Sequence, residues 1–368
     1  MQENLAKAYT AQHCRMHTRN STQLPTAVPS NMPRALVATD PFAIQAVLIA
    51  VRQAAQVLCD RATLLVLLHA HTSACKYAEF AERTGLGNRL LSTRLVQLTE
   101  AGLLVRIPYS RRPLRHAYHL THMGVALFDV LALLATWEQA WSETHSNDVG
   151  VRLEHLGCAG PDAGARNATT RLHCAACGDA VDPRDVALRL SYTEMARMPG
   201  KSTATRRSNA DAAGPSAQSG LAPPLRQCLA VLGDKWSIEV LVCAFFGVHQ
   251  FGDFSARIGI STNILTDRLN RLQEAGLFRR TVQGDRLRTG LYLLTAKGRD
   301  FYGILIAIQS WADDWIDHRV RSPVKLRHTL CQKSLRPRLV CKDCGQPLNH
   351  TQGVLRIEPP ATIRRAPA

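Results

Sequence analysis

Eight cysteine and histidine side chains follow one spacing that occurs twice in the chain. Each copy has a histidine and a cysteine separated by two residues, and then a C-x-x-C pair with a following glycine: His155, Cys158, Cys174 and Cys177, and again His328, Cys331, Cys341 and Cys344. Two ligand pairs joined by a loop are typical of a zinc ribbon, in which Zn²⁺ takes four ligands tetrahedrally. The sequence therefore predicts two structural zinc ions, each held within one copy, with no open position for water.

Other arrangements of these side chains remain possible. The thiols could be buried groups without a metal, and His173 could replace His155 as a ligand. The glycine after each C-x-x-C pair, Gly178 or Gly345, is expected to allow a turn that points backbone N–H groups at the thiolates. Four further cysteines lie in apolar helical surroundings and are expected to be small core residues: Cys59, Cys75, Cys228 and Cys243.

The elements around these ligands are also repeated. The decapeptide RLVQLTEAGL at 94–103 returns as RLNRLQEAGL at 268–277, a lag of 174 residues. At the same lag VLCDRATLLVL corresponds to VLGDKWSIEVL, and Trp137 and Trp141 correspond to Trp311 and Trp315. This lag is too long for a solenoid repeat and fits one small domain with a linker. The sequence therefore predicts a tandem duplication.

Composition limits the class of protein. The 368 residues are 46% hydrophobic, enough for two modest cores. No apolar run approaches the roughly 20 residues that span a bilayer, and the amino-terminal segment lacks a secretory signal's apolar centre. We expect a cytoplasmic protein without a membrane partner, in which the 11 cysteines are thiols or metal ligands. The net charge of +16 makes nucleic acid the first polyanion to consider and indicates a nucleoid-associated location.

Local signals follow one order in both halves. Helices are expected at 41–59 and 61–70, and again at 224–233 and 235–247, each pair followed by a shorter helix. Leucines at i, i+4 and i+7 then form an apolar stripe on a helix that ends at EAGL, where Gly102 or Gly276 supplies the left-handed cap. Two extended runs around a basic turn predict a hairpin, and a final helix carries the tryptophans. This order predicts a mainly α fold with small β-hairpins: two winged helix-turn-helix domains in tandem, each followed by a zinc-ribbon-like module.

Composition shifts give the expected boundaries. We expect a disordered arm (1–39), winged helix domain 1 (40–145), zinc-ribbon-like module 1 (150–192), a flexible linker (193–222), winged helix domain 2 (223–320), zinc-ribbon-like module 2 (321–358) and a disordered tail (359–368). Below, unit one is 40–192 and unit two is 223–358.

A helix fits the major groove while a hairpin lays arginines along the neighbouring DNA backbone. The recognition helices are expected to present residues turned away from the leucine stripe: Asn88, Arg89, Ser92, Thr93 and Arg94, and Thr262, Asn263, Thr266, Asp267 and Arg268. Arg94 and Arg268 are expected to hold phosphate or brace the fold. The wings each hold four arginines, expected to neutralise phosphates: Arg106, Arg111, Arg112 and Arg115, and Arg279, Arg280, Arg286 and Arg288.

Unit two resembles the HxlR-type winged helix regulators. The resemblance rests on LGDKWSIEVL, GISTNILTDRLNRLQEAGLFRR and LYLLTAKG, against a family pattern of roughly GGKW, a short helix ending in IS, LxxRLxxLxxxGL and YxLTxxG. Unit one is less similar, with CDRA in place of the GGKW-like stretch and GLGNRLLSTRL in place of GISTNILTDRL. The resemblance implies a bacterial transcription regulator that binds DNA as a dimer, most often as a repressor.

A tandem chain can pair its own units, because the linker holds them at roughly millimolar effective concentration. We therefore predict sequence-specific binding of double-stranded DNA by an intramolecular pseudo-dimer on an asymmetric operator, since the two recognition helices differ. A homodimer with four winged helices is the alternative pairing, and a protein-interaction scaffold is the alternative function. No phosphate loop, nucleophile elbow or open metal triad is present, so an enzyme is not expected. The sequence does not identify an inducer.

Overall fold

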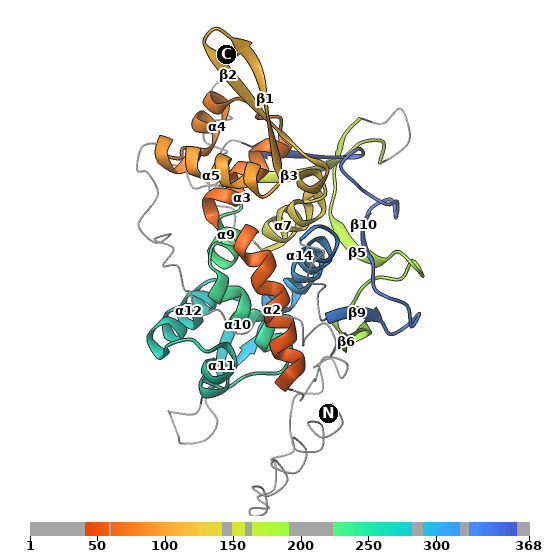
Figure 1. Ribbon diagram of the computed structural model, residues 1–368. Helices are drawn as coiled ribbons and strands as arrows, with labels where there is room; N and C mark the ends of the chain where they lie inside the picture. Colours follow the sequence, from red (N-terminus) through yellow and green to blue (C-terminus); the bar gives the residue numbers. More distant parts are fainter. Residues whose placement is uncertain are drawn as a thin grey trace, which may run out of the picture. The chain divides into compact units, whose positions relative to one another are not determined.

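Helices and short strands follow the same order in both units of the computed structural model (Figure 1). The structure describes residues 41–58, 60–141, 149–158, 164–190, 224–281, 290–316 and 324–358, all within one compact body, Pro33–Ala368. The arm at 1–39, the linker at 193–222 and the tail at 359–368 lie outside the described residues.

Each unit begins with helices and a hairpin. In unit one the elements are α2 (Pro41–Leu58), α3 (Arg61–His71), α4 (Tyr77–Thr84), α5 (Asn88–Glu100), β1 (Leu104–Arg111), β2 (Leu114–Leu120), α6 (His122–Val125) and α7 (Phe128–Trp141). In unit two they are α9 (Arg226–Leu232), α10 (Lys235–Phe245), α11 (Phe251–Ile258), α12 (Thr262–Glu274), β7 (Phe278–Thr281), β8 (Leu291–Leu294), α13 (Ala296–Asp300) and α14 (Tyr302–Trp315).

Short strands follow in both units. Unit one adds β3 (Gly150–His155), β4 (Arg166–Asn167), β5 (Thr170–Cys174), the 3₁₀ turn η1 (Pro183–Asp185) and β6 (Val186–Leu190). Unit two adds β9 (Val324–His328), β10 (Pro337–Cys341) and β11 (Gly353–Glu358).

Local chemistry explains the helix ends. Asp60 begins α3 by accepting the backbone N–H of Thr63, and Asp234 begins α10 by accepting that of Ser237, as N-cap residues do. Beyond α5, Gly102 has φ 76°, a left-handed conformation that costs glycine nothing, and Gly276 has φ 74° beyond α12. The predicted caps at EAGL are confirmed.

The leucine stripes face the core as predicted. The stripe residues are fully buried on α5 and α12: Leu91, Leu95 and Leu98, and Leu265, Leu269 and Leu272. Each hairpin leaves its helix in the same way, because the backbone N–H of Thr121 donates to Leu103 O at 3.0 Å and that of Thr295 donates to Leu277 O at 2.9 Å. The wing therefore has a fixed starting point against its recognition helix.

The short strands pair between units, except β4, which pairs with β3 of its own unit. β3 is antiparallel to β11, and β9 is antiparallel to β6. β5 pairs with β10, its own counterpart, and Leu172 lies opposite Leu339, each two residues before its C-x-x-C pair (Figure 1). The exchange is reciprocal, so β5 and β10 meet at a local two-fold relation. The expectation of a self-contained ribbon in each unit is therefore wrong for these strands.

The last helices also meet across the units, where α7 contacts α14 (Figure 1). Trp137 Nε1 of unit one donates to Lys297 O at 3.3 Å, and Trp311 Nε1 of unit two donates to Met123 O at 3.1 Å. Met123 and Lys297 occupy equivalent places in THMG and TAKG, so the two hydrogen bonds are also reciprocal. The tryptophans predicted to be core or interface residues thus tie the units together.

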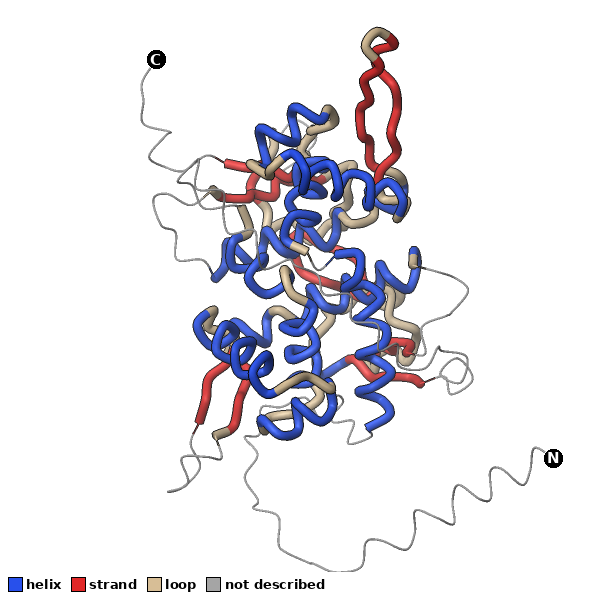
Figure 2. Tube along the Cα trace, turned by 60° about the vertical axis from the view of Figure 1, so that its left-hand side comes forward, coloured by secondary structure: helices blue, strands red, loops and turns tan. Residues whose placement is uncertain are grey.

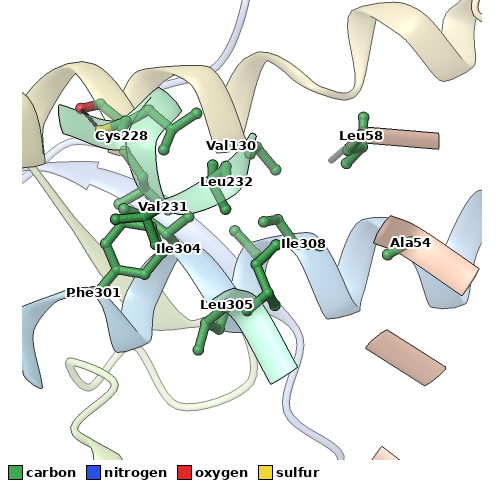
Figure 3. Close-up of a cluster of buried hydrophobic side chains, with 14 of the residues drawn as sticks. Ala54, Leu58, Val130, Cys228, Val231, Leu232, Phe301, Ile304, Leu305 and Ile308 are labelled. Atoms are coloured by element: carbon green, nitrogen blue, oxygen red, sulfur yellow. Dashed lines mark hydrogen bonds between the residues drawn. The ribbon is translucent and has the colours of Figure 1, made fainter. Parts of the chain in front are cut away.

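One apolar core runs through both units. Figure 3 shows side chains of one apolar cluster: Ala54 and Leu58 from α2, Val130 from α7, Cys228, Val231 and Leu232 from α9, Ile304, Leu305 and Ile308 from α14, and Phe301, the residue before α14. Beside it, Arg52 Nε and Nη2 donate to the carboxylate of Glu239 at 2.8 and 2.7 Å. The carboxylate of Glu239 is 1% exposed and the side chain of Arg52 is 31% exposed, so this cross-unit ion pair is partly buried.

One helical run is longer and more apolar than expected. His122–Trp141 has the length and the mean hydropathy, 1.3, that would suffice for a membrane span, so the expectation that no run approaches that length is wrong. Of this window 61% is buried inside the protein. The run combines α6 and α7 and packs at the contact between the units, where a core helix is apolar on most sides.

Candidate nucleic-acid interface and metal centres

The helix-turn-helix of each unit consists of a short helix, a glycine turn and the recognition helix. Gly85 with φ 64° ends α4, and Gly259 with φ 74° ends α11. α5 and α12 follow, and they expose eight of the ten side chains predicted on the recognition helices: Asn88, Arg89, Ser92, Thr93, Thr262, Asn263, Thr266 and Asp267. A row of exposed polar groups on a helix with a buried leucine stripe can present donors and acceptors to base edges.

The two remaining recognition-helix residues face inward. Arg94 Nε donates to Asp60 Oδ2 at 2.7 Å, and Arg268 Nε lies 2.8 Å from Asp234 Oδ2. These are the aspartates that cap α3 and α10, so each arginine ties its recognition helix to the start of another helix. Of the two roles considered for Arg94 and Arg268, the geometry matches the brace.

Some candidate base-reading groups have internal partners. Tyr77 Oη donates to Asn88 O at 3.1 Å and lies 3.3 Å from Asn88 Oδ1, and Ser92 Oγ donates to the same phenol at 3.3 Å. Tyr77 therefore belongs to the exposed polar row of unit one, which sequence reasoning missed. The available signal was its position at the start of the KYAEF segment, where unit two has Phe251 without a hydroxyl.

The wing of unit one is fully described. Its arginines are all exposed: Arg106, Arg111, Arg112 and Arg115. β1 and β2 run from Leu104 opposite Leu120 to Arg111 opposite Leu114, with an irregularity between Pro108 and Ser110. In Figure 2 this hairpin projects away from the helices. Projection and positive charge are what contact with a phosphate backbone requires.

The wing of unit two is described in part. Arg279 and Arg280 on β7 are exposed, whereas Arg286 and Arg288 lie outside the described residues. The guanidinium of Arg280 lies over the ring of Tyr292, 5.8 Å from its centroid. Stacking of this kind orients the guanidinium plane of an arginine without engaging its N–H donors.

The eight predicted metal ligands form two clusters, but with exchanged partners. One cluster contains His155 and Cys158 of unit one with Cys341 and Cys344 of unit two. The other contains Cys174, Cys177, His328 and Cys331. The expectation that each unit holds its own four ligands is wrong. The antiparallel pairing of β5 with β10 is the cause, because it carries each C-x-x-C pair to the histidine of the other unit.

The distances within the clusters fit a tetrahedral metal. Within each cluster the possible ligand atoms lie no more than 4.8 Å apart. Tetrahedral Zn²⁺ with four sulfurs at its usual bond length separates neighbouring sulfurs by roughly 3.8 Å. The Sγ atoms of Cys158 and Cys341 are 3.8 Å apart, and Cys344 Sγ is 3.5 Å from His155 Nδ1.

The second cluster has the same dimensions. Cys174 Sγ is 3.9 Å from Cys331 Sγ, and Cys177 Sγ is 3.3 Å from His328 Nδ1. Three thiols and one imidazole in this arrangement suit Zn²⁺ and leave no position for a substrate. The alternative ligand His173 lies apart from the cluster, with Nδ1 2.7 Å from Gly178 O.

The turns after the C-x-x-C pairs prepare the thiols for a cation. Gly178 has φ 86° and Gly345 has φ 71°, as expected for these tight turns. Desolvation opposes ionisation of Cys174, but backbone N–H groups such as that of Ala176 outweigh it and lower the pKa of this thiol. By contrast, desolvation and the neighbouring thiols raise the pKa of Cys158 to about 12. A bound metal would lower the pKa values of the thiols in the cluster, because it ligates the thiolate form.

The remaining cysteines match the core interpretation in part. Cys228 and Cys243 are buried, Cys75 is half-buried, and Cys59 lies outside the described residues. Burial raises the pKa of Cys243 to about 12, so this thiol stays protonated and packs as a small apolar group.

Similar segments occur in solved structures. A protein of Pseudomonas aeruginosa that is assigned as a transcription factor, PA1374, is 32% identical with a TM-score of 0.29, and the match covers 34% of this chain and 86% of that one. A second protein with the same assignment, PA1607, is 33% identical with a TM-score of 0.25, covering 34% and 78%.

Curated relatives are similar over one unit. The uncharacterised HTH-type transcriptional regulator Rv3095 of Mycobacterium tuberculosis is 35% identical over 120 residues, 33% of this chain and 76% of the relative. Its counterpart sll1512 of Synechocystis is 35% identical over 116 residues, covering 31% and 84%. The profile described as HxlR-like helix-turn-helix matches twice, at 57–146 and 231–320. The chain therefore belongs to the HxlR-like helix-turn-helix family and carries its domain in two tandem copies.

Proposed function

We propose that this transcriptional regulator binds one DNA duplex with both of its winged helices, as an intramolecular pseudo-dimer that acts as a repressor. The observation that carries the proposal is the reciprocal exchange between units: strands, metal ligands and tryptophan hydrogen bonds all have partners in the other unit. Two subunits of a symmetric dimer make such isologous contacts. Here one chain supplies both partners, which favours one chain per operator over a homodimer.

We propose an asymmetric operator. The exposed positions of α5 are Asn, Arg, Ser and Thr, whereas those of α12 are Thr, Asn, Thr and Asp. Arginine can bond guanine bidentately and asparagine can bond adenine, so the half-sites should differ. Asp267 is already engaged, since its carboxylate lies 2.7 Å from Arg268 Nη1 and 3.0 Å from Arg271 Nε. Among the residues of unit two, Asn263 is then the candidate for a bidentate contact with a base.

Selection from random duplex DNA tests the operator. We expect two unlike half-sites about one helical turn, roughly 34 Å, apart. Arg89→Ala should weaken the base preference in one half-site and Asn263→Ala in the other. Each variant should lose about 1–3 kcal/mol of discrimination between the preferred base and the other bases. Recovery of perfect palindromes alone, or loss of the same half-site in both variants, contradicts the asymmetric arrangement. Native mass of the complex should give one chain per duplex.

The salt dependence of binding separates the regulator from a protein-interaction scaffold. Each arginine that neutralises a phosphate adds about 0.9 to the slope of log affinity against log salt. The double variant Arg106→Ala, Arg111→Ala should therefore lower the slope by about 1.8. Arg327→Ala, on β9 and outside the wings, should leave it unchanged. Affinity that is insensitive to salt supports the scaffold.

We propose that the two clusters hold structural Zn²⁺, so that the modules at 150–192 and 321–358 fold jointly. Native mass spectrometry of double variants tests both the metal and its partners. Cys158→Ser with Cys174→Ser removes one ligand from each cluster, and should lower the zinc content from two ions to none. Cys158→Ser with Cys341→Ser removes two ligands from one cluster and should leave one ion. The reverse pattern would establish sites within each unit, and no zinc in the unaltered chain refutes the metal.

We propose that binding takes place in the cytoplasm, at the nucleoid, and that it lowers transcription. A reporter driven by the operator recovered in the selection tests the sign. Expression of the unaltered chain should reduce reporter output, and the wing double variant Arg106→Ala, Arg111→Ala should restore it. Increased output would make the protein an activator without affecting the DNA-binding proposal.

A further inference from the structure

A cavity of about 590 Å³ lies at the contact between the units. Residues of α6 and α7 form one wall and residues of α14 form the other, while Leu172 and Pro337 contribute from the paired strands β5 and β10. Asn349 and His350, from the segment between β10 and β11, also line it. The volume falls within the range of about 300–1,000 Å³ typical of small-molecule sites. Because both units supply walls, a molecule in this cavity would contact both.

The charge in the cavity is negative. Asp129 and Asp314 line it, and the lining residues that the structure describes include neither lysine nor arginine. Asp129 is half-buried and desolvated, and among the described residues its carboxylate has neither a hydrogen-bond donor nor an ion-pair partner. Desolvation of a carboxylate is costly when no partner offsets it, and a cation that enters the cavity would supply that partner.

The rest of the lining is aromatic and apolar. Phe128, Trp311 and Trp315 contribute rings, together with smaller groups such as Val125 and Ala126. The Trp311 indole N–H is used in its bond to Met123, so that residue is fixed in place. Trp315 is 38% exposed. Aromatic faces beside carboxylates suit a positively charged group attached to an apolar body.

The equivalent surface at the other end of the local two-fold relation is occupied by the chain itself. Where the cavity has Val125, Ala126 and Phe128, unit two has Arg299, Asp300 and Tyr302. There Asp300 accepts the indole N–H of Trp141, the counterpart of Trp315, at 2.7 Å.

On the same surface a lysine ammonium group lies over a tryptophan ring. Lys297 Nζ lies 5.2 Å from the centroid of the Trp137 ring. Unit one has Met123 in place of Lys297, so Trp311 lacks this cation. The duplication thus places charged side chains on one surface and uncharged ones on the equivalent surface, where the cavity lies beside Asp129.

We propose that this cavity is a binding site for a small organic cation with an aromatic or other apolar ring system. Asp129 pairs with the positive charge, and Phe128, Trp311 and Trp315 contact the rings. The binding itself does not depend on DNA. Its role as the inducer site rests on the proposed function, since a ligand bound between α7 and α14 would change the positions of the two winged helices relative to each other.

Fluorescence polarisation with free protein tests the site without DNA. Rhodamine 6G serves as an aromatic cation and fluorescein as an anion of related ring structure, while benzyltrimethylammonium and tetraphenylphosphonium serve as competitors. We expect rhodamine 6G to bind in the micromolar range and at least one competitor to displace it, with fluorescein at least ten-fold weaker. Asp129→Asn should weaken rhodamine 6G at least ten-fold, and Glu82→Gln, an exposed change on α4, should have no effect.

A second variant fills the cavity with the residues of the other unit. Val125→Arg with Ala126→Asp should abolish binding while the far-ultraviolet spectrum stays native. Equal binding of the anion and the cation, binding unchanged in Asp129→Asn, or no binding of any of the three cations overturns the proposal. Because no DNA is present, these outcomes leave the proposed function intact, and a failure of operator selection leaves the cation site intact.

Discussion

Arg268 shows how one side chain can sit on a recognition helix without reading DNA. Its side chain is 8% exposed and pairs with Asp234, the cap of α10. Arg268→Ala removes the ion pair from this half-buried carboxylate and leaves it only the hydrogen bonds from Ser237, which should cost about 1.5–3 kcal/mol of unfolding free energy. Arg271→Ala, one turn along and half exposed, should cost less than about 0.5 kcal/mol. Denaturant unfolding measures both, and equal effects of the two variants would contradict the brace.

Asp129 should make the free protein less stable above mildly acidic pH. Desolvation raises its pKa from 3.8 to about 6. Between these values the folded protein keeps a proton that the unfolded chain has released, so this residue's contribution to stability falls as the pH rises. Asp129→Asn should therefore stabilise the protein at pH 7, by at most about 3 kcal/mol. The gain should vanish near pH 4, and destabilisation at pH 7 would show that the carboxylate has a hidden partner.

The strand β11 depends on a glycine where it passes unit one. A Cβ on Gly353 would overlap the ring of Phe128 and lie 2.7 Å from Leu348 Cδ2. Gly353→Ala should lower the free energy of unfolding by about 1–3 kcal/mol, because these side chains must move. Gly252 in α11 has nothing within 4 Å of such a Cβ, so Gly252→Ala should raise it by about 0.5–1 kcal/mol. A neutral Gly353→Ala would indicate that β11 does not pack there.

The elements that sequence predicts correctly are those specified by nearby residues. The leucine spacing determines the buried face of α5 and α12, and the aspartate caps and glycine turns determine where helices begin and end. The partners of β3, β5 and β6 could not be predicted in this way. Their counterparts have the same ligand spacing, so either pairing satisfies the pattern, and only packing over long chain separations selects the exchanged one. The position of Asp129 in a cavity likewise has no local signal, because residues of α14, far along the chain, form the other wall.

The two units should stay associated after the chain between them is cut. If a protease site is placed within 193–222 and cut, the two halves should still elute together, because strand pairs and α7–α14 contacts cross between them. A zinc chelator should lower the denaturant concentration at which the halves separate. The cut Cys158→Ser, Cys174→Ser variant should behave like the chelated protein without any chelator. Spontaneous separation of the unaltered cut chain would refute the exchange.

The exchanged pairing also has a consequence for synthesis on the ribosome. β3 and β6 find their partners in β11 and β9, which are translated more than a hundred residues later. Until residues 324–358 have emerged, the helices of unit one can form, but its strands and the two of four ligands that it supplies to each cluster stay without their partners. A nascent chain stalled in unit two should therefore recruit holdase chaperones, and a premature stop codon anywhere before Gly353 should yield a product that is degraded instead of a working half-protein.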